Sequence, residues 1–162
     1  MKNTKLNKWL YLLIIAVVLL DQLGKFFVVS NIYDYESVTI IPHVLSFTNV
    51  LNSGIIFGMF FQNNNAIVVI SLILVCLLFA YLILSNMGKI KAEYLTSRIA
   101  IAFCLVIGGA ASNIIDRVFR IAVIDYIRLD FFNFPIFNLA DIAITLGAIL
   151  LIWEIVFPRK TK

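Results

Sequence analysis

The sequence predicts an integral membrane protein that is mainly α-helical, with four transmembrane helices and a small β-sheet beside the membrane. Of its 162 residues, 62% are hydrophobic and 14% are charged, whereas soluble domains are about half apolar and about a quarter charged. Four segments are apolar over the roughly 20 residues that a helix needs to cross a ~30 Å hydrocarbon core. The length indicates a single membrane domain, residues 1–162.

The four predicted helices cover residues 9–29, 66–84, 99–115 and 137–157. Basic residues precede the first helix, as in a secretory signal, but no small-residue cleavage site follows, so we expect a retained helix. Nine Lys and Arg residues lie before the first helix, between the second and third, and after the fourth, while the other two connections hold three. The positive-inside rule therefore predicts that both termini are cytoplasmic.

Within the first outer connection, the β-rich loop at residues 37–61 contains no Asp, Glu, Lys or Arg. Its segments 38–41 and 44–50 are rich in β-branched and aromatic residues, which favours short strands. We expect a small sheet on the outer leaflet side, followed by a loop at 54–61 that is partly inserted into that leaflet.

Polar side chains inside apolar helices are costly and mark candidate functional positions. Asp21 and Lys25 lie four residues apart on one face of the first helix, which allows a structural ion pair. Their place near the outer end also allows Lys25 to extend toward the lipid headgroups. Asn113, Asp116 and Arg117 share one face of the third helix, where Arg117 could bind Asp116 or an oxygen of a substrate.

Two further carboxylates stand near the fourth helix. One of them, Asp141, has a sufficient structural explanation: Asn138 can be the N-cap of the helix, and Asp141 then lies in its first turn, where a carboxylate is favoured. It does not explain Asp125, which stands in an apolar run between Ile124 and Tyr126. Two neighbouring carboxylates share a proton, so one can activate water while the other protonates a leaving amine. Asp125 and Asp141 are therefore the candidate catalytic pair of an aspartyl peptidase that needs neither metal nor cofactor.

Other chemistries find little support in the sequence. There is one histidine, His43, and no HExxH or GxSxG motif, which argues against a zinc protease and a serine hydrolase. Cys76 and Cys104 lack the spacing of a metal or redox motif, and no pattern indicates a nucleic-acid partner. These residues alone leave open a small transporter with a polar path through Asp21, Lys25 and Asp116.

Five motifs, taken in order, resemble those of the bacterial lipoprotein signal peptidases (signal peptidase II). Each motif is weakly specific by itself, but together they span almost the whole chain. They are Asp21-Gln-Leu-Gly-Lys25, Asn52-Ser-Gly54-Ile-Ile-Phe57-Gly58, Gly108-Gly-Ala-Ala-Ser-Asn113-Ile-Ile-Asp116-Arg117, Val123-Ile-Asp125-Tyr-Ile127 and Phe134-Pro-Ile-Phe-Asn138-Leu-Ala-Asp141.

The resemblance implies an intramembrane aspartyl endopeptidase of the bacterial cytoplasmic membrane, with its active site toward the outer leaflet. It implies that diacylglyceryl-modified prolipoproteins are cut just before the lipidated lipobox cysteine. Membrane lipid and globomycin-type cyclic peptides are the other expected ligands, and we expect a monomer. By resemblance, Asp125 and Asp141 are catalytic. The residues implied to bind substrate are Asn52, Gly54, Asn113, Arg117 and Asn138, and those implied to support the site are Asp21, Lys25 and Asp116.

Five residues depart from the family pattern, two of them Ile124 and Tyr126, where valine and phenylalanine are commoner. The family usually has alanines where this chain has Ile55 and Ile56, and the larger side chains could narrow the substrate groove. It usually has glycine at Ser112, in a run of small residues, 108–112, that predicts close helix packing; we expect the serine to loosen that packing. A non-catalytic relative that binds lipopeptides or inhibitors therefore remains an alternative, as does the transporter. A different intramembrane aspartyl protease is disfavoured because a Gly-x-Gly-Asp motif is missing.

Overall fold

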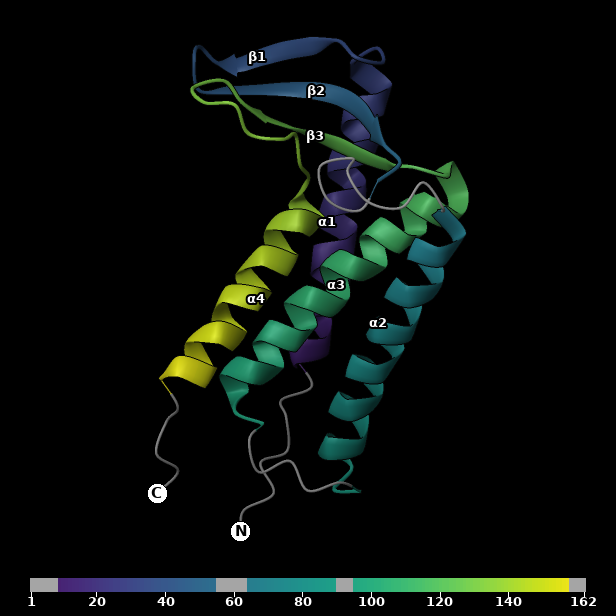
Figure 1. The fold of residues 1–162 in the computed structure, drawn as a ribbon, viewed down its shortest axis with the longest axis vertical. Coiled ribbons are helices and arrows are strands. Elements are labelled where there is room, and N and C mark those ends of the chain that lie inside the picture. The colour runs from purple at the N-terminus through teal and green to yellow at the C-terminus, as the bar shows by residue number, and fades with distance from the viewer. Residues whose placement is uncertain (1–8, 55–63, 90–94, 158–162) are drawn as a thin grey trace.

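A computed structural model describes residues 9–54, 64–89 and 95–157 of the chain. Four helices stand side by side, and a three-stranded antiparallel sheet in the order β1-β2-β3 lies across one end of them (Figure 1). The elements are α1 (Trp9–Asn31), β1 (Ser37–Ile41), β2 (Leu45–Asn52), α2 (Asn64–Asn86), α3 (Ser97–Arg120), β3 (Val123–Leu129) and α4 (Leu139–Val156). The predicted fold class is confirmed.

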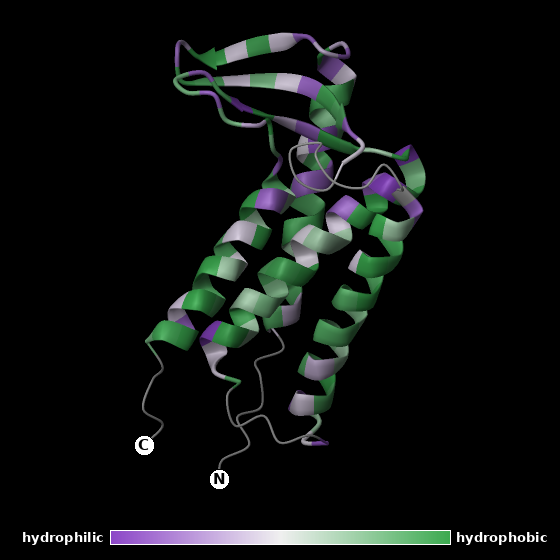
Figure 2. Cartoon of the chain, viewed as in Figure 1, coloured by the Kyte–Doolittle hydropathy of each residue, from purple (hydrophilic) through white to green (hydrophobic). Residues whose placement is uncertain are grey.

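The helices distribute their side chains as proteins do in lipid. In α1 the buried residues include Asp21 and Lys25, whereas Leu20, Leu23 and Phe26 are 61%, 62% and 67% exposed. Apolar residues cover the helices, and hydrophilic ones gather where the bundle meets the sheet (Figure 2). All four helices are long and apolar enough to cross a membrane. Apolar exposure with polar burial is the arrangement expected where hydrocarbon replaces water as the solvent.

Helix α3 forms the centre of the bundle and packs against each of the other three helices. Small residues permit this close contact. Gly108 lies against Val17 of α1, Gly109 lies against the carbonyl oxygen of Ala140 in α4, and Gly147 of α4 lies against α3. The close packing predicted from the small residues at 108–112 is confirmed.

The sequence did not predict the third strand. Val123–Leu129 pairs with β2, and α3 runs to Arg120 instead of ending near residue 115. Only two residues separate the helix from the strand, and the turn depends on Ile121, whose backbone adopts the left-handed conformation with φ 68°. A β-branched residue is unusual there, so the ordinary turn signals of glycine or asparagine are missing. The expected inserted loop at 54–61 lies, apart from Gly54, outside the described residues.

We predict that Gly109→Ala destabilises the fold. A methyl group at this position would overlap the Ala140 carbonyl oxygen and approach Ile144 Cγ1 to 2.8 Å, and overpacking of this kind costs about 1–3 kcal/mol. Thermal unfolding in detergent should show a lower midpoint than for the native chain. Val118→Ala, on an exposed face of the same helix, is the control. Equal midpoints for the two variants would contradict the close packing of α3 and α4.

Candidate active site

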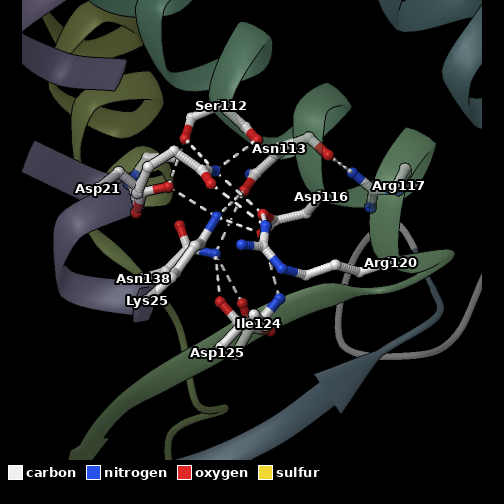
Figure 3. Close-up of polar contacts among 12 residues, drawn as sticks. Asp21, Lys25, Ser112, Asn113, Asp116, Arg117, Arg120, Ile124, Asp125 and Asn138 are labelled. Atoms are coloured by element: carbon white, nitrogen blue, oxygen red, sulfur yellow. Dashed lines mark hydrogen bonds and ion pairs between the residues drawn. The ribbon is translucent and has the colours of Figure 1, made fainter. Parts of the chain in front are cut away.

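The interior of the bundle below the sheet holds an ammonium group between two carboxylates. Lys25 Nζ lies 2.6 Å from Asp21 Oδ2 and 2.6 Å from Asp116 Oδ2, and all three side chains are fully buried. The predicted ion pair of Asp21 and Lys25 is therefore confirmed. The expectation that Lys25 extends toward the headgroups is wrong, because two anions hold its ammonium inside the bundle (Figure 3).

Asp116 connects this pair to α1, α3 and β3. Its carboxylate accepts hydrogen bonds from Gln22 Nε2 at 3.0 Å, Arg120 Nη1 at 2.5 Å and the backbone N–H of Ile124 at 3.3 Å. An ion pair with Arg117 was one of the contacts expected of Asp116, but the ion pairs of Asp116 among the described residues are with Lys25 and Arg120. The expectation failed because the third helix was taken to end before Arg120, which lies one turn beyond Asp116.

Asn113 links the buried cluster to α4 through hydrogen bonds. Its Oδ1 accepts a hydrogen bond from Lys25 Nζ at 3.0 Å, and its Nδ2 donates to Asp141 Oδ1 at 3.0 Å. The backbone N–H of Ala140, the residue before Asp141, donates to Asp21 Oδ1 at 3.0 Å. Residues of α1 and α3 thus converge on the first turn of α4.

Asn138 has two structural roles. Its Oδ1 accepts from the Asp141 N–H at 2.9 Å, while Asp141 Oδ2 accepts from the Asn138 N–H at 3.2 Å. This reciprocal capping box begins α4, so the predicted N-cap is confirmed. The amide nitrogen of Asn138 also donates to Asp125 Oδ1 at 2.7 Å. Asn138 therefore bridges the two carboxyls, with its side-chain amide on Asp125 and its backbone N–H on Asp141.

Asp125 reaches this position from β3. The strand is fixed by β2 on one side and by the Phe137 carbonyl on the other, which accepts from the N–H groups of Tyr126 and Ile127. The β2–β3 register shifts between Phe47 and Val50, the partner of Asp125, and such irregularities re-aim side chains at functional sites.

The environment of Asp125 disfavours its ionised form. The pKa of Asp125 is raised to about 7, chiefly by burial and also by the charge of Asp141, although hydrogen bonds from Asn52 and Asn138 and the charge of Lys25 lower it. Asp125 is therefore partly protonated at neutral pH and mainly protonated below it, beside a second carboxyl group. That is the arrangement of a carboxyl pair holding one proton.

The loop after β2 joins the same site. Asn52 Nδ2 donates to Asp125 Oδ2 at 2.8 Å, and Asn52 Oδ1 accepts from the Gly54 N–H at 2.9 Å. Arg117 Nη2 donates to the Gly54 carbonyl at 2.9 Å. The structure thus brings together all ten site residues named from the sequence, in one connected network of hydrogen bonds and ion pairs.

Three polar residues of this network were missed. Gln22 donates to Ser112 and Asp116, Arg120 donates to Asp116, and Ser112 Oγ donates to Asp21 Oδ2 at 2.6 Å. Ser112 was expected to loosen the helix packing, but its hydroxyl links α3 to α1. The presence of Gln22 in an otherwise apolar stretch beside Asp21 was the available signal.

The chain is similar to known proteins over most of its length. The family model described as "Signal peptidase (SPase) II" matches residues 13–157. The lipoprotein signal peptidase of Chlorobium phaeobacteroides is 38% identical, with 94% of each chain covered, and that of Lactobacillus johnsonii is 36% identical, with 95% of this chain and 96% of its own covered.

Solved structures agree as well. Two structures of a bacterial membrane enzyme, determined by the in meso method, superpose with TM-scores of 0.81 at 28% and 29% identity. They cover 93% and 99% of this chain, and 93% and 100% of their own chains are covered. With a family model that matches most of the sequence, and relatives above 30% identity over nearly their full length, this chain belongs to the signal peptidase II family and is a peptidase.

Proposed function

We propose that this protein is an intramembrane aspartyl endopeptidase, with Asp125 and Asp141 as its catalytic pair. Its substrates are prolipoproteins that carry diacylglycerol on the lipobox cysteine, and it cuts the peptide bond just before that cysteine. The observation that carries the proposal is that Asn138 holds both carboxyls: its side-chain amide donates to Asp125 on β3, and its backbone N–H donates to Asp141 Oδ2 at the start of α4. The names of the relatives support the substrate class.

The chemistry follows from one proton held between two carboxyl groups. The ionised carboxyl removes a proton from a water molecule as its oxygen attacks the scissile carbonyl carbon, and the protonated carboxyl donates a hydrogen bond to the carbonyl oxygen. The resulting tetrahedral species collapses, the C–N bond breaks, and a carboxyl proton passes to the departing amine. The products are the free signal peptide and a lipoprotein whose amino-terminal residue is the lipidated cysteine.

The remaining site residues hold the substrate and the pair in place. Asn52 and Asn138 donate to Asp125, Asn113 donates to Asp141, and Arg117 holds the Gly54 carbonyl. A buried environment strengthens such hydrogen bonds, because water does not compete for them. These groups therefore restrict the two carboxyls to a narrow range of positions.

We place the protein in the bacterial cytoplasmic membrane, as one membrane domain with both termini in the cytoplasm. Nine of the 13 Lys and Arg residues then lie on the inner side, and the sheet and active site face the outer leaflet. A substrate anchored by its acyl chains and an apolar segment can reach such a site without leaving the bilayer. Globomycin-type peptides are proposed to bind at the same site, and the protein is proposed to act as a monomer surrounded by lipid.

We predict that Asp125→Asn and Asp141→Asn each abolish cleavage, because an amide can neither accept the proton of water nor supply one. Lipidated and unlipidated prolipoprotein should be incubated with the purified protein in lipid or detergent, and the products separated on a gel. The native chain should cut only the lipidated form.

Asp130→Asn is the matched control, since Asp130 lies near the surface beside Arg128 and Ser46. It should cleave at the native rate. Near-native cleavage by Asp125→Asn or Asp141→Asn would contradict the assignment of these two residues as the catalytic pair. Solute flux without any cleavage would favour the transporter, and substrate binding without cleavage would favour a non-catalytic relative.

We predict that the cleavage rate falls as pH rises, with a midpoint near the Asp125 pKa of about 7. The sign follows because the raised pKa keeps Asp125 protonated below the midpoint, and the reaction needs one protonated carboxyl. Asn52→Ala should move the midpoint upward, since the Asn52 hydrogen bond lowers this pKa. A pH–rate profile measures both effects. A rate that stays level from about pH 6 to about pH 9 would contradict the role of Asp125.

A further inference from the structure

We infer that Lys25 is a positioning residue for the reaction: its ammonium fixes the amide of Asn113 so that the NH2 group faces Asp141. This inference rests on the proposed function, and it assigns a specific role to a residue predicted only to support the site. The route runs from the centre of α1 through α3 to the first turn of α4.

The first step is that every N–H group of the Lys25 ammonium has an oxygen acceptor. Lys25 Nζ has three N–H donors, and three oxygens lie within 3.0 Å of it: one each from Asp21, Asp116 and Asn113. Two of the three acceptors are anions, which hold the nitrogen in place. The third is a neutral amide, and it is the member of the set that contacts the proposed catalytic pair.

The second step concerns the orientation of that amide. Asn113 lies between an ammonium, which only donates, and the carboxyl of Asp141. If its amide rotated by 180°, two NH2 hydrogens would face the Lys25 ammonium, and a carbonyl oxygen would face an ionised Asp141. Both contacts are repulsive. Lys25 therefore selects the orientation in which Nδ2 donates to Asp141 Oδ1.

The third step shows that the same cluster also fixes the backbone at Asp141. Asp21 is held by Lys25 and by Ser112 Oγ, and its other oxygen accepts the free N–H of Ala140. The first N–H groups of a helix lack partners within the helix, so α1 satisfies one at the start of α4. Side chain and backbone at Asp141 thus depend on a single buried cluster.

The orientation has a further consequence for Asn138. Its Nδ2 also donates to Asn113 Oδ1, at 3.3 Å, and it donates to Asp125 Oδ1. The oxygen that Lys25 turns away from Asp141 is therefore the acceptor that the bridging amide of Asn138 uses. A rotated Asn113 would disturb both carboxyl groups of the pair.

The test uses Lys25→Met within an Asp21→Asn background. The background removes one anion, so loss of the cation does not leave Asp21 charged and unpaired, and Asp116 keeps Arg120, Gln22 and the Ile124 N–H. kcat and KM for the lipidated substrate are measured with each Lys25 variant, in the presence and in the absence of Asn113→Ala. This design is a double-mutant cycle between Lys25 and Asn113.

With Asn113 present, Lys25→Met should lower kcat about 100-fold, the size of effect that follows from a misplacement of about 1 Å, and leave KM nearly unchanged. In the Asn113→Ala background, the same change should lower kcat by no more than about twofold. The inference would be overturned if Lys25→Met lowered kcat by the same factor with and without Asn113→Ala. An unchanged kcat for Lys25→Met would also overturn it.

Arg98→Met with Glu154→Gln is the matched control, because it removes a charge pair at the far end of α4 from Asp141. We expect this control to lower the unfolding temperature and to leave kcat of the folded fraction unchanged. The same result for Lys25→Met would mean that Lys25 has a structural role only. If the Lys25 variant does not fold, Asn113→Asp is used in its place. This substitution keeps an oxygen acceptor for Lys25 but turns an oxygen instead of an NH2 group toward Asp141. An unchanged kcat for Asn113→Asp would overturn the inference. A native chain that cleaves nothing would overturn the proposed function and this inference together, whereas an active native chain with uncoupled variants would overturn the inference alone.

Discussion

The buried ammonium of Lys25 is the charge on which the arrangement of the bundle depends. Moving an ion out of water is costly, and removal of one partner from a buried ion pair costs about 3–5 kcal/mol because the other charge is left uncompensated. Lipid offers the ammonium no substitute, so Asp21, Asp116 and Asn113 must meet at one point. This requirement sets how α1 and α3 face each other. It also sets the position of α4, since the backbone of Ala140 binds Asp21.

Glycine contacts and polar contacts act together in this bundle. Gly108 and Gly109 let α3 approach α1 and α4 closely, and the short separation brings Ser112 and Asn113, one turn further along, within hydrogen-bonding distance of both neighbouring helices. Because apolar surface provides little drive for helices to associate in lipid, packing and hydrogen bonds must supply it. The same segment of α3 therefore provides the close contact and the polar partners that it makes possible.

The parts of the fold that follow from local sequence were predictable. Four long apolar segments gave the four helices, and the Asn138–Asp141 spacing indicated the capping box. The strand β3 was missed because α3 extends to Arg120 and turns through Ile121, a residue that rarely adopts φ 68°. Its pairing with β2 depends on contacts between residues more than 70 positions apart, which no local pattern reports. For the same reason the expected partner of Asp116 was wrong, although the resemblance to family motifs had named the residues that meet here.

The double use of Asn138 has a consequence for how this chain can change length. The Phe137 carbonyl is bound to β3, and the next residue both begins α4 and bridges the two carboxyls. One residue added or removed between Phe137 and Asp141 would rotate Asp141 by about 100° around the helix axis and separate it from Asp125. The segment from Phe131 to Phe134, with large exposed side chains, makes ring contacts along itself and to Phe137 but does not set the rotation of Asp141 around the helix axis. Insertions and deletions between β3 and α4 are therefore tolerable before Phe137 and not after it, so this connection has a variable part and a part of fixed length.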